Sequence, residues 1–97
     1  MNFEIAPKET EIRANWDNAR LYCTFLEVDG KRGWQLPTKE ELNEIYNSDN
    51  DFEKVWYWSS TENNGSNAWV QYFNLGSQGY DYKGNGGYYV RAIRDLK

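Results

Sequence analysis

Apolar residues recur at helical spacing in two separate parts of the chain. The first part starts at Asn15, a good N-cap residue, and Gly30 is expected to end it. Between these two positions, apolar side chains fall three or four residues apart and share one face of a helix. These side chains are Trp16, Ala19, Cys23 and Leu26, with Tyr22 beside them. The pattern predicts a helix whose single apolar stripe packs on a core.

The second helical segment has a stronger start signal. Thr38 stands three residues before Glu41 in "LPTKEEL", which is the spacing of a capping box. The apolar stripe that follows consists of Leu42, Ile45 and Tyr46. Glu40, Glu41 and Glu44 lie largely opposite that stripe. We interpret them as a solvated face and not as paired catalytic carboxylates.

Four runs of strand-forming residues surround the helices, at 2–6, 56–60, 68–75 and 88–93. Two polar loops, 61–67 and 76–87, separate the last three runs, and each contains an Asn-Gly turn signal. The order of strand, two helices and then strands predicts one α+β domain over residues 1–97, with both helices packed on a small antiparallel sheet. The N-terminal run has no earlier partner, so we expect it to pair with the C-terminal run.

The segment "WYWSST", residues 56–61, combines large aromatic residues with hydroxyls. Alternation along a strand places Trp56 and Trp58 on one face and Tyr57 and Ser59 on the other. We expect the tryptophans to enter the core and the hydroxyls to satisfy backbone groups where the strand ends. A chain of this length supports one core. The predicted core residues are Trp16, Trp34, Leu36, Trp56, Trp58 and Trp69.

Two arginines near the C-terminus are expected to play unequal structural parts. Arg91 and Arg94 are three positions apart, which places them on opposite faces of a strand. One of the two should pack along the edge of the core and pair with an acid, whereas the other should face water.

The charge balance and the lack of long apolar segments exclude several partners. The net charge is −4 and the basic residues are not clustered, so we expect no nucleic acid as partner. No segment is apolar enough for membrane insertion. The N-terminal residues lack the pattern of a signal peptide. Synthesis in the cytoplasm is expected, with association with a virus particle as one destination, unless the chain is a domain cut from a longer protein.

The residue types that most enzymes need are scarce in this chain. It has no His and a single Cys, so the commonest general base, dithiol chemistry and internal disulfides are excluded. Cys23 sits within a helical pattern and is interpreted as a small buried hydrophobe. We therefore predict that the protein is not an enzyme and carries no cofactor.

Calcium is the one metal that the sequence leaves open. Asp49, Asp51 and Glu53 alternate in "DNDFE", which resembles the start of a loop of oxygen ligands. The glycine and the distal glutamate of a helix-loop-helix calcium site are missing. Asp81 and Asn85 form a second candidate pair. A solvated loop without metal is the preferred interpretation.

The two polar loops are the predicted binding surface. Both are long for a domain of this size, and long loops in compact domains are often functional. Tyr, Asn, Ser and Gly predominate in binding loops, because tyrosine offers rigid contact area and the polar residues adapt their hydrogen bonds. The candidate residues are Asn63, Asn64, Asn67, Tyr80, Asp81, Tyr82 and Asn85. An equally weighted alternative is that Tyr80 and Tyr82 fold back over the edge of the sheet.

Five motifs, in order, resemble those of the Lcl C-terminal domain family, named for a collagen-like bacterial adhesin. They are "NWDNARLYC", "GWQLPTKEEL", "YWSSTE", "AWVQYF" and "YYVRAIR". The resemblance implies a C-type lectin-like fold with two helices, a small sheet, a long loop region and paired termini, here without disulfides. The Glu-Pro-Asn or Gln-Pro-Asp triplet and the Trp-Asn-Asp triplet of calcium lectins are missing. Calcium-dependent sugar binding is therefore not carried over from that superfamily.

Two classes of function follow from this resemblance and from the loops. The first is a structural or binding module of a virus particle, such as a phage decoration or fibre protein. The start at Met1 without an export signal favours this class. The alternative is a ligand-binding domain of a bacterial surface adhesin. Expected partners are subunits of an assembly, including further copies of this chain, or a surface receptor or glycan. Binding is expected on the loops and not on the helices, whose apolar stripes are used by the core.

Overall fold

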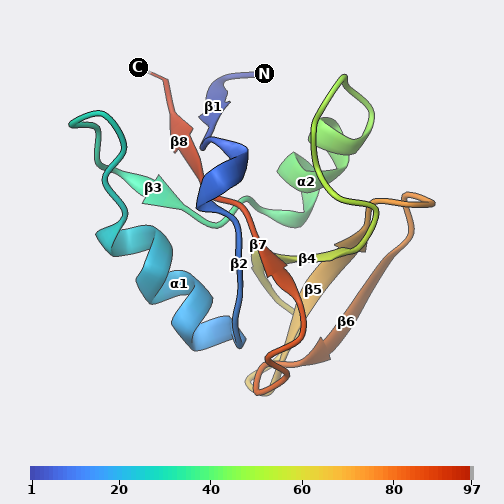
Figure 1. Cartoon of the computed structure of the whole chain (residues 1–97). Helices are drawn as coiled ribbons and strands as arrows, with labels where there is room; N and C mark the ends of the chain where they lie inside the picture. The colour runs from blue at the N-terminus through green and yellow to red at the C-terminus, as the bar shows by residue number, and fades with distance from the viewer. Residues whose placement is uncertain (97) are drawn as a thin grey trace.

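A computed structural model describes residues 1–96, and Figure 1 shows how its elements are arranged. The described residues form two α-helices and eight strands, and the strands are arranged in two sheets. The predicted α+β class is therefore confirmed. The elements are β1 (Phe3–Ile5), a 3₁₀ turn (Lys8–Thr10), β2 (Ile12–Arg13), α1 (Trp16–Phe25), β3 (Trp34–Gln35), α2 (Lys39–Tyr46), β4 (Trp56–Glu62), β5 (Asn67–Tyr72), β6 (Gln78–Tyr82), β7 (Tyr89–Val90) and β8 (Ile93–Asp95). Within residues 1–96, no helix combines the length and apolar character that a membrane crossing requires.

Both helices begin where their capping residues predict. The backbone N–H of Asn18 donates to Oδ1 of Asn15 at 2.9 Å. At the start of α2, the N–H of Glu41 donates to Oγ1 of Thr38 at 3.1 Å, and the N–H of Thr38 donates back to Oε1 of Glu41 at 2.8 Å. This reciprocal pair satisfies two N–H groups that the helix itself cannot satisfy.

The end of α1 differs from the prediction. The helix ends at Phe25 and does not continue to Gly30. The N–H of Val28 and the carbonyl oxygen of Lys31 form a hydrogen bond of 3.0 Å, which closes a tight turn. Asp29 and Gly30 hold φ angles of 50° and 78° in that turn. Gly30 therefore serves the turn after the helix, which is a role that glycine fills without strain.

The strands form a five-stranded and a three-stranded sheet instead of the single small sheet that was predicted. The five-stranded sheet has the order β2-β7-β4-β5-β6, and the other has the order β1-β8-β3. One pair, β4 with β7, is parallel, so the antiparallel prediction holds for every other pair but not for this one. The short strands β2, β3 and β7 span two residues each. Such strands carry no detectable periodicity in a sequence.

The two ends of the chain pair as predicted. Strand β1 lies antiparallel to β8, with Phe3 opposite Asp95 and Ile5 opposite Ile93. Figure 1 shows both termini emerging side by side at the same end of the molecule. The predicted run 88–93 is not one strand, however, because the chain passes from β7 in one sheet to β8 in the other at Arg91 and Ala92.

The core consists of two apolar clusters and not one. Adjacent residues of the central strand β4 point to opposite faces, and both faces are covered. Trp58 packs in the cluster that contains Trp16 of α1, whereas Tyr57 packs in the cluster that contains Leu42 of α2. Trp58 and Tyr57 are both completely buried. Two thin clusters on one shared sheet fit a chain that is too short for two separate cores.

Four of the six predicted core residues are buried, and two are not. Trp16, Trp34, Leu36 and Trp58 are each at most 5% exposed. Trp56 is half-buried and stacks on Tyr72 at a centroid distance of 4.8 Å, because it lies towards the margin of the first cluster. Trp69 belongs to neither cluster. It is half-buried, and Nζ of Lys39, the first residue of α2, lies 3.9 Å from the centre of its ring.

The predicted loop 76–87 contains a strand. Residues Gln78–Tyr82 form β6, which pairs antiparallel with Asn67–Gln71 over five positions. The segment reads as a loop because Gly79 and Asp81 interrupt the aromatic residues. Their alternation with Tyr80 and Tyr82 nevertheless has the period of a strand. As a result the two tyrosines are held on a sheet edge and not on a flexible loop.

Candidate functional site

The structure brings the two predicted binding segments together. Asn67, at the start of β5, lies directly opposite Tyr82, at the end of β6. The N–H of Lys83 also donates to the carbonyl oxygen of Ser66 at 2.8 Å. The turn after β4, which carries Asn63 and Asn64, therefore lies beside the end of β6. Five-residue pairing between β5 and β6 gives this region a rigid base.

Most of the polar candidates use their side chains to hold the turns. Oδ1 of Asn64 accepts from the N–H groups of Ser66 and Asn67 at 2.8 and 2.9 Å. Oδ1 of Asn85 accepts from the N–H of Gly87 at 2.8 Å. These are the local side chain to backbone bonds typical of such residues in turns. They leave less hydrogen-bonding capacity for a ligand than the sequence alone suggests.

Asp81 is likewise engaged within the protein. One of its oxygens accepts from the hydroxyl of Tyr88 at 2.5 Å and from Nδ2 of Asn85 at 3.1 Å. The hydrogen bond from Tyr88, then the one from the backbone of Tyr82, holds the pKa of the Asp81 carboxyl below its ordinary value, although burial opposes this shift. Burial and the bond to Asp81 raise the pKa of Tyr88 to about 12. This pair connects β6 to the residue that precedes β7.

Strands β5 and β6 carry an aromatic surface that consists of the exposed Tyr80 and Tyr82 and the half-buried Trp69, which we call the aromatic strip. Tyr80 and Tyr82 are 55% and 63% exposed and share one face of β6. Trp69 lies directly opposite Tyr80, with ring centroids 5.3 Å apart at 74°. Nζ of Lys39 lies 3.9 Å from the centre of the Trp69 ring. Both tyrosines thus remain largely accessible, although Tyr80 leans on Trp69.

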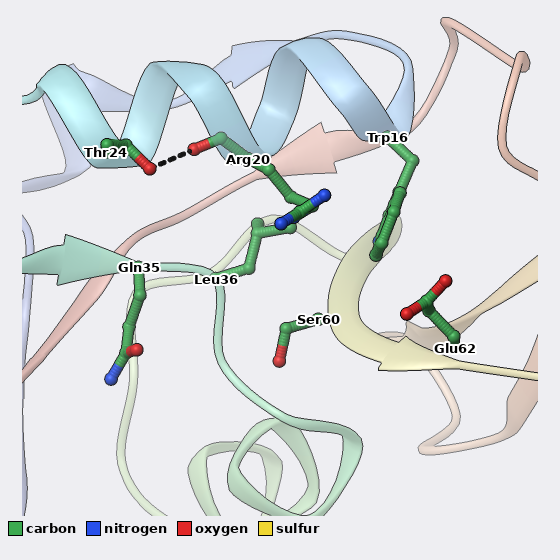
Figure 2. Close-up of a pocket in the computed structure, with 7 residues that line it drawn as sticks. All are labelled: Trp16, Arg20, Thr24, Gln35, Leu36, Ser60 and Glu62. Atoms are coloured by element: carbon green, nitrogen blue, oxygen red, sulfur yellow. Dashed lines mark hydrogen bonds between the residues drawn. The ribbon is translucent and has the colours of Figure 1, made fainter.

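A polar pocket lies between α1, β3 and β4, and no pattern in the sequence predicts it. Its volume is about 340 Å³. The buried rings and side chains of Trp16 and Leu36 line it together with Arg20, Thr24, Gln35, Ser60 and Glu62. Figure 2 shows the guanidinium of Arg20 beside Trp16, with Ser60 and Gln35 around the same space. No spacing rule could have found this pocket, because residues far apart in sequence meet only after folding.

Two cationic side chains next to the pocket, Arg20 and Lys83, lie over the indole ring of Trp16. The guanidinium carbon of Arg20 lies 4.8 Å from the centre of that ring, and Nζ of Lys83 lies 4.3 Å from it. Lys83 also forms an ion pair of 2.5 Å with Glu62. The hydrogen bond and the charge of Lys83 hold the pKa of the Glu62 carboxyl below its ordinary value, and the charge of Arg20 adds to this.

Helix α1 carries exposed apolar side chains, which contradicts the expectation that its apolar residues are used by the core. Leu21 is 54% exposed and Phe25 is 73% exposed. They are four residues apart and therefore lie on one side of the helix. Both line an open groove together with the apolar side chains of Ile12, Tyr22 and Leu26. The apolar stripe of α1 is thus wider than the core face.

The Cys23 thiol is buried in the core, and the acidic loop 49–53 forms ion pairs within the protein. Cys23 is buried, and burial raises the pKa of its thiol to about 12. Asp51 pairs with Arg91 at 2.8 Å, and Glu53 pairs with Lys8 at 2.5 Å. Across residues 1–96, no three His, Cys, Asp or Glu side chains gather closely enough to hold a metal ion.

Together these features define a small α+β domain with an exposed aromatic strip, a polar pocket and an apolar groove. The family model described as the Lcl C-terminal domain matches residues 4–94, and the chain therefore belongs to that family. Membership suggests a surface module of the adhesin type. A comparison with curated proteins found no match.

Proposed function

We propose that this chain is a non-enzymatic recognition module of the adhesin type, which attaches to a glycan or a protein surface through the aromatic strip. The observation that carries the proposal is the exposure of Tyr80 and Tyr82 on a paired strand. Membership in the Lcl C-terminal domain family agrees with it. All seven predicted binding residues remain part of the proposed site. Tyr80 and Tyr82 make the contact with the ligand, and the other five residues surround them and shape the turns: Asn63, Asn64, Asn67, Asp81 and Asn85.

The physical case rests on the rigidity of the rings. A tyrosine loses few side-chain rotamers on binding, and it presents both an apolar face and a hydroxyl. The two rings project from one face of β6, and Trp69 supports Tyr80 from the next strand. Aromatic anchors usually carry most of the binding energy of an interface. The exposed tyrosine rings of this strip suit the apolar face of a sugar ring or a protein epitope.

The C-type lectin-like fold is part of the same proposal. Its support is the order of the elements, with two helices between the N-terminal strand and the later sheet, and the pairing of β1 with β8. In this interpretation the hairpin turns and β6 correspond to the long loop region in which ligands are bound. We propose no metal in that region, because its acidic and amide side chains hold the turns instead.

The test is attachment of the labelled domain to an array of glycans and an array of purified extracellular proteins. Tyr80→Ala/Tyr82→Ala should abolish the attachment seen with the wild type and leave the melting temperature nearly unchanged, because both rings are mostly exposed. Leu21→Ala/Phe25→Ala is the matched control, since it removes two large exposed side chains from α1. Normal attachment by the tyrosine double mutant would show that the strip is not the binding surface.

The second candidate function is a structural component of an assembly, such as a decoration or fibre protein of a phage particle. The exposed pair Leu21 and Phe25 favours it, because large apolar side chains next to a groove are typical of contacts between protein chains. The partner would be a neighbouring subunit, including another copy of this chain. Sedimentation of the wild type should then show a defined oligomer that Leu21→Glu/Phe25→Glu dissociates. A monomer at all concentrations would argue against self-assembly.

A further inference from the structure

The polar pocket contains three side chains whose hydrogen-bonding groups are unused. Within residues 1–96, the guanidinium of Arg20, the amide of Gln35 and the hydroxyl of Ser60 form no hydrogen bond or ion pair with another protein group; Arg20 and Gln35 are solvent-exposed, and Ser60 is half-buried. All three line the same space in Figure 2. Thr24 differs, because its hydroxyl donates to the carbonyl oxygen of Arg20 at 3.0 Å. Because all three line one pocket, that pocket offers donors of three kinds to an oxygen-rich ligand long enough to reach from Arg20 to Gln35.

Arg20 is held in place before any ligand arrives. Its guanidinium carbon lies 4.8 Å from the centre of the Trp16 ring. That ring is itself fixed, because Trp16 is 4% exposed and its Nε1–H donates to the carbonyl oxygen of Ser59 at 2.9 Å. An arginine stacked on a fixed ring loses less freedom when it binds an anion. Its planar fork matches the two oxygens of a carboxylate.

The charges of the pocket also favour an anion. Glu62 is the carboxylate in its lining, and the ion pair with Lys83 offsets its charge. The charge of Arg20 therefore remains uncompensated by any ion pair, although the whole chain has a net charge of −4. The floor, formed by Trp16 and Leu36, is apolar and suits the carbon skeleton of a small molecule. A volume of about 340 Å³ admits a small metabolite and not a macromolecule.

We propose that this pocket binds a small hydroxylated carboxylic acid. Arg20 holds the carboxylate through two N–H groups, and the hydroxyl of Ser60 and the amide of Gln35 bind the neighbouring hydroxyls of the ligand. The site is separate from the aromatic strip, so this inference goes beyond the proposed attachment function and does not depend on it. It assigns no reaction to the pocket.

The experiment is a titration of the ¹⁵N-labelled full chain with D-galacturonate, D-gluconate and L-malate, followed by amide chemical shifts. D-galactose is the neutral counterpart of galacturonate and tests the need for the carboxylate. We expect a saturable shift of the amides of Arg20, Gln35 and Ser60 with at least one of the acids, and no such shift with galactose. Shifts of equal size with galactose, or no saturable shift with any of the three acids at millimolar concentrations, would overturn the proposal.

Two arginine variants make the test specific. Arg20→Gln should weaken binding by at least about tenfold, because it removes a charge-assisted pair of hydrogen bonds. Arg32→Gln is the matched control, since Arg32 is an exposed arginine outside the pocket and the charge change is the same. Equal weakening by both variants would mean that only overall charge matters, which would contradict a built site. Tyr80→Ala/Tyr82→Ala should bind the acid normally, so failure of the attachment function and failure of this proposal remain distinguishable.

Discussion

The guanidinium of Arg91 and the carboxylate of Glu11 form a buried ion pair of 2.9 Å, with their side chains 4% and 8% exposed. Arg91 also donates to the carbonyl oxygen of Ala6 at 2.6 Å and to Asp51 at 2.8 Å. The hydroxyl of Tyr57 donates to the same Glu11 oxygen at 2.8 Å. This single cluster connects the N-terminal segment, β4 and the segment between β7 and β8. It lies where the chain passes from one sheet to the other.

Replacing Arg91 should therefore destabilise the protein far more than replacing Arg94. Arg91→Ala leaves the buried carboxylate of Glu11 with only Lys8, whose Nζ lies 3.9 Å away, and loss of the partner in a buried ion pair typically costs about 3–5 kcal/mol. Arg94 pairs with Glu4 at 2.7 Å, but both side chains are near 30% exposed, at 31% and 28%. Arg94→Ala should cost no more than about 1 kcal/mol. Urea unfolding of the two variants gives the comparison, and equal, small losses would contradict it.

The different structural roles of Arg91 and Arg94 could be predicted from the sequence, but their partners could not. Spacing alone predicts that one of them packs at the core edge with an acid, and Arg91 does so. Spacing does not identify the acid, because Glu11 is eighty positions away and comes close only through folding. The expectation that the other arginine faces water is wrong in part, since Arg94 pairs with Glu4 across β1 and β8.

Local chemistry made the helix starts and the pairing of the termini predictable. The capping box of Thr38 and Glu41 is a property of four adjacent residues, and it forms as expected.

The apolar groove could not be predicted, because it depends on contacts between elements that are distant in the sequence. Leu21 and Phe25 fit the helical period as well as the core residues do, and only the packed structure shows that no strand covers them. The polar pocket likewise depends on tertiary contacts between three elements.

The two tryptophans of β4 should differ clearly in their contribution to stability. Trp58 is completely buried and its Nε1–H donates to the carbonyl oxygen of Ala14 at 2.9 Å. Trp58→Ala should cost about 3–5 kcal/mol, as truncations of buried aromatic residues do. Trp56→Ala is the control, because Trp56 is only half-buried and should cost clearly less. Denaturant unfolding of both variants measures the difference. Wild-type stability of Trp58→Ala would show that Trp58 is not a core residue.

Removal of residues 1–6 should destabilise the fold although the segment is short. The deletion removes β1 as the partner of β8 and takes away Phe3 from the second apolar cluster. It also removes the carbonyl oxygen of Ala6, which accepts from Nε of Arg91. Replacement of Met1 and Asn2 alone is the control, because both are exposed and lie before β1. Identical thermal melts of the deleted and full chains would show that the pairing of the termini adds nothing.

The hydrogen bond from Tyr88 to Asp81 should make part of the stability depend on acid pH. Because the pKa of Asp81 in the folded protein lies below its ordinary value of 3.8, the unfolded chain binds this proton first as the pH falls. The resulting stability is present above about pH 3.8 and is lost as the pH falls through the folded pKa.

Tyr88→Phe tests this contribution without removing the ring, which packs against Trp58 at a centroid distance of 5.0 Å. The variant should raise the pKa of Asp81 towards 3.8 and reduce the loss of stability on acidification, because the main hydrogen bond that favours the carboxylate is gone. Carbon-13 titration of the Asp81 carboxyl measures the pKa directly. Tyr80→Phe is the control, since Tyr80 precedes Asp81 in β6 but points to the other face. An unchanged Asp81 titration in Tyr88→Phe, or the same change in Tyr80→Phe, would assign the lowered pKa to a different cause.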